Sequence, residues 1–95
     1  MHYFKLSGFI PENKQREFEQ TYRLVSSHMP SSCKQHSVSR DLLHKNVFHF
    51  VCYWDSLTSM EIFSGSSECT IMIGAFKTLG ELYDDVRGEM QQVKN

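Results

Sequence analysis

The 95-residue chain has no excess of either charge, because ten Lys and Arg residues stand against eleven Asp and Glu residues. Binding to a nucleic-acid backbone or to an anionic membrane surface needs clustered Lys and Arg. No apolar run approaches the roughly 20 residues that a membrane-spanning helix needs, and the N-terminal residues do not read as a secretory leader. These absences predict a cytoplasmic protein with no nucleic-acid partner and no membrane partner.

Cysteine is also scarce. Cys33, Cys52 and Cys69 are odd in number and widely spaced, so they predict neither a disulfide framework nor a paired-cysteine metal site. No His, Asp or Glu stands at metal-ligand spacing, and no glycine-rich phosphate loop follows a predicted strand. We therefore expect three reduced thiols and no metal, flavin or other cofactor.

Aromatic residues, by contrast, are plentiful, and they concentrate in the segment 47–54, VFHFVCYW. In extended form one face of this segment carries four apolar side chains, and the other carries three apolar side chains and His49. A strand that is apolar on both faces needs protein on both sides. So short a chain supplies that cover most simply with a second copy, so the segment predicts a homodimer. Trp54, at its end, is the first candidate for a site.

Hydrophobic spacing predicts the order of elements along the chain. The first two elements are a strand over 2–10 and a helix that is capped by Asn13 and ended by Pro30. Two strands follow, over 33–40 and 47–54, and a turn at 41–46 joins them. The next element is a helix with the capping box Thr58 and Glu61, which is interrupted at 65–67 and ends at Gly80. The final segment fits either a helical stripe or a strand. We favour a turn at Asp84-Asp85 and a strand over 86–93.

This order, β-α-β-β-α-β, is typical of the ferredoxin-like α+β fold with an antiparallel four-stranded sheet. The chain length corresponds to a single domain over 1–95. Two helices can cover only one face of such a sheet. The other face would expose a large apolar patch unless a second sheet packed on it, which again favours a two-fold dimer.

Most of the chain resembles the antibiotic biosynthesis monooxygenase-like proteins, which are dimeric α/β barrels and include small quinol monooxygenases. The matching pieces are HYFKLSGFIP, EFEQTYRLV, SVSRDL, FHFVCYWDS and SSECTIMIGAFKTLGE. The resemblance implies a ligand cavity between the sheet and the helices, in or beside which Trp54 would lie. Members that oxidise phenols or quinols use neither metal nor flavin, because the deprotonated substrate supplies the electrons.

A haem-degrading branch of the same fold uses an Asn on the first strand, this Trp, and a His on the second helix. Here Ser7 stands at the Asn position, and the His position falls at Phe63 or Ser64. Only Trp54 matches. Because axial ligation of haem needs a donor that this position lacks, the comparison disfavours haem chemistry.

Trp54 and His36 are the candidate catalytic residues. Trp54 offers an aromatic face and an N–H donor, although a strand-end core position would suit it equally well. An imidazole is the natural base for a phenol near neutral pH. His36 ranks ahead of His49, which shares the predicted dimer face, and a hydrogen-bonded structural histidine is the alternative for both. The candidate substrate-binding residues are Ser7, Ser37, Phe50, Cys52, Phe63 and Phe76.

The predicted function is therefore that of a cofactor-independent monooxygenase acting on a small electron-rich aromatic of the quinol or phenol type. The alternative is a non-catalytic homodimer that binds or senses a small aromatic ligand in the same cavity. No nucleophile with a neighbouring base and orienting group is recognisable, so the sequence gives hydrolase chemistry no support. Oxygen consumption with quinols separates the two functions.

Overall fold

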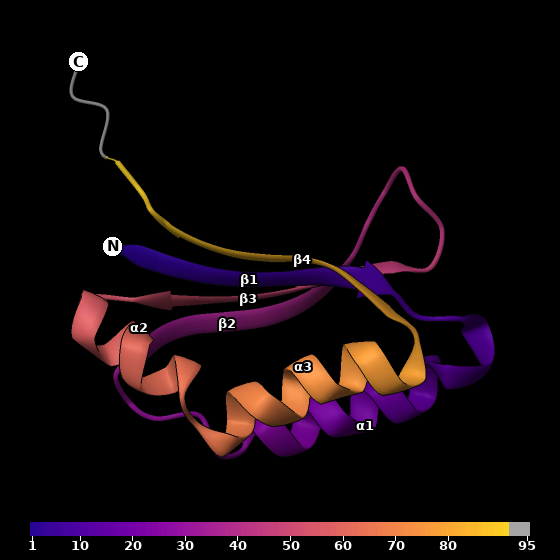
Figure 1. The fold of residues 1–95 in the computed structure, drawn as a ribbon, viewed down its shortest axis with the longest axis horizontal. Coiled ribbons are helices and arrows are strands. Elements are labelled where there is room, and N and C mark those ends of the chain that lie inside the picture. Colours follow the sequence, from indigo (N-terminus) through magenta and orange to yellow (C-terminus); the bar gives the residue numbers. More distant parts are fainter. Residues whose placement is uncertain (92–95) are drawn as a thin grey trace.

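The structure, a computed structural model, describes residues 1–91. The elements are β1 (His2–Phe9), the 3-10 turn η1 (Glu12–Lys14), α1 (Gln15–Ser26), β2 (Cys33–Arg40), β3 (Val47–Trp54), α2 (Leu57–Ser64), α3 (Ser67–Leu79) and β4 (Glu81–Glu89). The four strands form one antiparallel sheet in the order β2-β3-β1-β4. The helices all lie on one face of it (Figure 1). The predicted ferredoxin-like α+β protomer is thus confirmed.

The core lies between the sheet and the helices. Alternate side chains of β1 and β3 point to this side and are buried, namely Phe4, Leu6, Phe48, Phe50, Cys52 and Trp54. The helices contribute the buried side chains Phe18, Val25, Met60, Phe63, Cys69, Met72 and Phe76. Burying each large apolar side chain contributes about 1.5–3 kcal/mol, so this layer is the main source of stability.

The helix starts differ from the predicted ones. Asn13 lies inside the 3-10 turn, and α1 begins only at Gln15. The predicted capping box is also wrong: the Ser56 hydroxyl accepts a hydrogen bond from the Ser59 N–H, at 3.1 Å, and α2 begins at Leu57. Sequence spacing alone could not rank Ser56 against Thr58, because both are good capping residues.

The last strand starts earlier than predicted. β4 runs through Asp84-Asp85 without a turn, because its backbone pairs with β1 from the Phe9–Glu81 pair onward. Sheet pairing here overrides the local turn preference of two adjacent aspartates. Val93, the predicted end of the strand, lies outside the described residues.

The face of the sheet opposite the helices is not covered by any element within residues 1–91. It carries Tyr3, Lys5, Ser7 and Phe9 from β1, and Val47, His49, Val51 and Tyr53 from β3. We call it the open face. The loop between β2 and β3, residues 41–46, stands on this side of the sheet (Figure 1). No helix within residues 1–91 is both long and apolar enough to cross a membrane.

Candidate functional site

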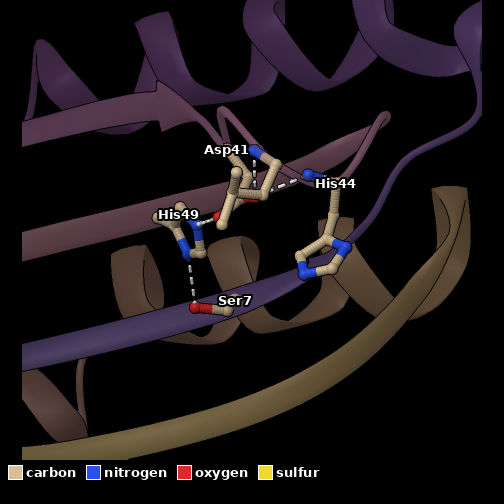
Figure 2. A network of polar contacts seen from close by, with 5 residues as sticks. Ser7, Asp41, His44 and His49 are labelled. Carbon is tan, nitrogen blue, oxygen red and sulfur yellow. Dashed lines mark hydrogen bonds and ion pairs between the residues drawn. The ribbon is translucent and has the colours of Figure 1, made fainter.

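Three polar side chains form a hydrogen-bonded chain on the open face (Figure 2). Ser7 on β1 and His49 on β3 are cross-strand partners, so their side chains lie side by side. Ser7 Oγ is 2.7 Å from His49 Nδ1. His49 Nε2 is 2.9 Å from Oδ1 of Asp41, the first residue after β2. The sheet register and the β2–β3 loop thus bring together residues from three separate parts of the sequence.

Asp41 is fixed by its own loop. Its second oxygen, Oδ2, accepts hydrogen bonds from the backbone N–H groups of Leu43, at 2.9 Å, and His44, at 2.7 Å, as an aspartate does at the start of a turn. The hydrogen bond from His49, together with these two backbone donors, lowers the pKa of Asp41 to about 2. The carboxylate is therefore ionised at neutral pH and can only accept hydrogen bonds.

This charge state sets the tautomer of neutral His49. Because the Asp41 carboxylate accepts, Nε2 of His49 carries the proton and donates it. Nδ1 then presents its lone pair, and the Ser7 hydroxyl donates to it. The resulting order is an aspartate that orients an imidazole, which in turn accepts from a serine hydroxyl.

The other end of the loop is held as firmly. Asn46 adopts a left-handed backbone conformation, with φ 66°, which asparagine tolerates better than most residues. Its carbonyl accepts from the Ile10 N–H at 2.8 Å, and its side-chain oxygen accepts from Gln15 Nε2 at 2.8 Å. Lys45 pairs with Glu12 at 3.0 Å on the surface. The loop that carries Asp41 is therefore anchored to the start of α1.

A cavity of about 620 Å³ lies between this loop and the open face, within the size range of small-molecule sites. Its lining includes the whole Ser7–His49–Asp41 chain. The apolar walls are Phe9, Leu43, Val47 and Tyr83, and the remaining polar groups are His44, Lys45 and Asp84. His49 also lines a neighbouring hollow of about 490 Å³ on the same face. The imidazole thus stands at the boundary between the protein and a space that can hold a ligand.

Trp54, the first sequence candidate, lies on the other side of the sheet. It is fully buried, and its indole N–H donates to Cys52 Sγ at 3.3 Å. Its ring packs against Phe63 with centroids 5.0 Å apart, and Phe50 packs against the same Phe63 ring at 6.4 Å. Phe50 and Phe76 are also fully buried. These aromatic side chains pack against one another in the core, and their roles in ligand binding stay predictions.

One hollow does approach this interior. It has a volume of about 270 Å³, lies between the segment after α1 and α2, and is lined by Phe63 but not by Trp54. Burial raises the pKa of the Cys52 thiol to about 12, and the thiol is accordingly neutral. The indole N–H and this neutral thiol thus satisfy one another without a ligand.

The remaining sequence candidates are divided between the two faces. His36 lies on the helix side of β2, where its Nδ1 is 2.8 Å from the Tyr22 hydroxyl. Ser37 pairs with Val51 and, like Ser7, belongs to the open face. Ser7 and Ser37 therefore do not lie beside Trp54, as the predicted pocket required. Their roles in substrate binding stay predictions, as do those of Trp54 and His36.

Asp41 is the residue that sequence reasoning missed. An Asp that opens a turn is a recognisable signal, but nothing in the sequence shows that its free oxygen reaches His49. That contact follows from the pairing of Ser39 with His49 next to the strand end. In residues 1–91, no group of three or more His, Cys, Asp or Glu side chains is arranged to hold a metal ion.

Comparison with known proteins gives matches in structure only. No family model matches the chain, and no curated protein matches it. A provisionally named antibiotic biosynthesis monooxygenase of Deinococcus radiodurans is 20% identical, with a TM-score of 0.80 over 100% of this chain and 97% of that chain. Another protein named antibiotic biosynthesis monooxygenase is 16% identical, with a TM-score of 0.75 over 99% and 100%.

A conserved protein of Bacteroides thetaiotaomicron, described as a possible oxidoreductase, is 10% identical, with a TM-score of 0.77 over 94% of this chain and 96% of that chain. Similarity at these identities establishes the fold, and function does not follow from fold. The resemblance inferred from the sequence is therefore confirmed in three dimensions: the chain has the fold of the antibiotic biosynthesis monooxygenase-like proteins.

Proposed function

We propose that the chain is a cofactor-independent monooxygenase that oxidises a small electron-rich aromatic of the phenol or quinol type, with His49 as the base. The observation that carries this proposal is the His49 imidazole held between the Asp41 carboxylate and the Ser7 hydroxyl in the wall of a 620 Å³ cavity. Such chemistry needs a base that can take the proton of the substrate hydroxyl, and His49 would do so through Ser7, because Asp41 holds its other ring nitrogen. The names of structurally similar proteins give the proposal its reaction class.

The residues suggest a route for the proton. A substrate hydroxyl could donate a hydrogen bond to Ser7 Oγ without breaking the one from Ser7 to His49 Nδ1, because the Ser7 oxygen retains free lone pairs. The substrate proton then moves to Ser7 while the Ser7 proton moves to His49, and Asp41 stabilises the imidazolium that forms. The electron-rich phenolate is the species that reduces dioxygen: one oxygen atom enters the ring as a quinone carbonyl, and the other leaves as water.

The cavity suits such a substrate. Phe9, Val47 and Tyr83 provide apolar walls for a flat ring.

We also propose that the open face pairs with the same face of a second copy, which would complete a barrel from two sheets. Aromatic and β-branched side chains, among them Tyr3, Val51 and Tyr53, lie half-buried on this face with no protein above them. Val86 and Met90 are 39% and 50% exposed beside them. An isologous contact would bury these side chains about a two-fold axis, and it would place the 620 Å³ cavity next to the partner subunit.

The packing around Trp54 supports a second candidate function, the non-catalytic binding of a small aromatic ligand. The hollow that ends at Phe63 would extend to Trp54 if the Phe63 ring rotated away. Trp54 would then act as a stacking surface, and His36 would lie nearby with Tyr22. In that case a ligand would bind and shift the indole fluorescence, and oxygen uptake would not occur.

Oxygen uptake with a panel of quinols and phenols, measured with a Clark electrode in the presence of a metal chelator, tests the proposal. The wild type should consume oxygen. His49→Gln should lower turnover by about 100-fold or more, the range for loss of a general base. His36→Gln is the matched variant, because it removes an imidazole from the other face, and it should stay close to wild type. Equal loss in both variants, or a wild type that consumes no oxygen, would refute His49 as the base.

A further inference from the structure

We propose that Ser7 is an activated nucleophile and that the same cavity cleaves small aryl esters by acyl transfer, a second activity besides the proposed oxidation. The chain Ser7–His49–Asp41 contains the three roles that such chemistry needs: a hydroxyl, a base within hydrogen-bond reach, and a carboxylate that orients the base. Both contacts, at 2.7 and 2.9 Å, already have the lengths of working hydrogen bonds.

The orientation of the imidazole is the reverse of the one in the well-known serine hydrolases, since Ser7 meets Nδ1 and Asp41 meets Nε2. This reversal leaves the chemistry intact, because in a neutral imidazole either nitrogen can accept while the other donates. What matters is that the carboxylate holds one tautomer. Asp41 does so firmly, because both of its oxygens are engaged by donors.

The surroundings of Ser7 limit its contact with water. The register shift of β4 against β1 beside Ser7 leaves Tyr83 of β4 without a cross-strand partner, and Tyr83 lines the same cavity. The residue Ser7 is 4% exposed, and it lines the cavity. Its hydroxyl is thus screened from bulk water except on the side where a substrate would bind.

The reaction balances with water as the only co-reactant. Ser7 Oγ bonds to the ester carbonyl carbon as its proton passes to His49 Nδ1. The tetrahedral intermediate then collapses, the carbon–oxygen bond to the aryl group breaks, and the imidazolium returns the proton to the departing phenoxide. A water molecule then attacks the acyl carbon as His49 takes its proton, the bond from that carbon to Ser7 Oγ breaks, and the imidazolium returns the proton to Ser7 Oγ as the carboxylic acid leaves.

The walls indicate the class of substrate. Phe9, Val47, Leu43 and Tyr83 favour a flat apolar group on one side of Ser7, which describes the aryl part of an aryl ester. The product phenol belongs to the substrate class of the proposed oxidation. Ester cleavage in this cavity would therefore release the compound that the same cavity could then oxidise.

Covalent labelling of the wild-type chain tests the proposal directly. The protein is treated with diisopropyl fluorophosphate under nitrogen, and the modified residue is located by peptide mass spectrometry. We expect a single adduct on Ser7. His49→Gln should slow the labelling by about 100-fold, because the hydroxyl loses its base. Ser39→Ala is the matched control: Ser39 pairs with His49 across β2 and β3 on the same face, and its loss should leave labelling at Ser7 unchanged.

A parallel assay measures hydrolysis of p-nitrophenyl acetate under nitrogen, so that oxidation cannot contribute. Ser7→Ala should reduce the rate to that of free imidazole at the same concentration, while Ser39→Ala retains it. Absence of a Ser7 adduct in the wild type, or labelling that is equally fast in His49→Gln, would overturn the proposal. Neither result depends on oxygen uptake, so failure here and failure of the proposed oxidation are distinguishable.

Discussion

The two faces of the sheet are built from the same strands but have opposite characters. Toward the helices, β3 presents only apolar or sulfur-containing side chains, all of them buried and in contact with one another. Toward the open face, the same strand presents His49 in a hydrogen-bonded chain with Ser7 and Asp41, beside two hollows. The aromatic face, which is the most prominent feature of the sequence, forms the core, whereas the open face carries the hydrogen-bonded polar groups on which the proposed chemistry depends.

The largest expected effect is a loss of stability when the packing on the helix-covered face is disrupted. Trp54→Ala should lower the free energy of unfolding by about 3–5 kcal/mol, because a fully buried indole leaves a cavity that the surrounding rings fill only in part. Urea denaturation followed by circular dichroism measures it. Leu42→Ala is the control, because Leu42 is 99% exposed and should change stability by less than about 0.5 kcal/mol. Similar losses in the two variants would show that the packing around Trp54 is not the source of stability.

The next expected effect is the loss of dimerisation when the open face is changed. Val51→Lys places a charge at the centre of that face, where two facing copies would bury it unpaired, and it should convert the dimer to a folded monomer. Sedimentation equilibrium at micromolar concentration provides the measurement. Ile62→Lys, on the exposed side of α2, should remain dimeric. A wild-type chain that is monomeric throughout this range would refute the dimer.

The dependence of stability on alkaline pH tests the buried thiols of the helix-covered face. Burial raises the pKa of Cys52 to about 12 and that of Cys69 to about 11, against an ordinary value of 9.0. The unfolded chain releases these protons first, so the folded chain holds more protons between pH 9 and 12. Stability should therefore be fully present below pH 9 and should fall as pH rises toward 12. Unfolding of Cys52→Ala measured at several pH values should show a smaller fall than wild type.

A titration to acid pH acts on the open face and should have the smallest effect on stability. The pKa of Asp41 is lowered from 3.8 to about 2, chiefly by the hydrogen bond from His49. The contribution of Asp41 to the stability of the folded chain is present above pH 4 and is lost as pH falls toward 2, since the unfolded chain binds the proton first. Asp41→Asn should remove this part of the acid dependence. If the acid profiles of variant and wild type coincide, the contact between Asp41 and His49 does not form in solution.

Much of the fold could be predicted from the sequence, because periodicity reports burial. The bounds of β2 and β3 and the interruption between α2 and α3 agree with the structure. The start of β4 could not be predicted, because the turn preference of Asp84-Asp85 is local while its pairing with β1 is not. The predicted C-cap Gly80 agrees with the structure, whereas the predicted N-cap of α2 was wrong because several serines and threonines compete within one short segment.

The candidate site was harder to predict, because it depends on register. Ser7 and His49 are 42 residues apart in sequence, and they meet only because the pairing of β1 with β3 sets residue 7 opposite residue 49. Asp41 reaches His49 only because the pairing of β2 with β3 sets Ser39 opposite His49, two residues before Asp41. Residue types and spacing thus favoured His36 and Trp54, whereas the geometry favours His49. The sequence shows that a histidine is present, but only the folded structure shows which groups hydrogen-bond to its imidazole.

We propose that the chemistry belongs to the open face and not to the buried tryptophan. The most direct test measures quinol-dependent oxygen uptake of His49→Gln and Trp54→Phe side by side, at equal concentrations of folded protein. We expect His49→Gln to lose about 100-fold in turnover, and Trp54→Phe to stay within about twofold of wild type, since it retains most of the buried ring. Loss of turnover in Trp54→Phe, with His49→Gln unaffected, would contradict the account and return the site to the space between the sheet and the helices.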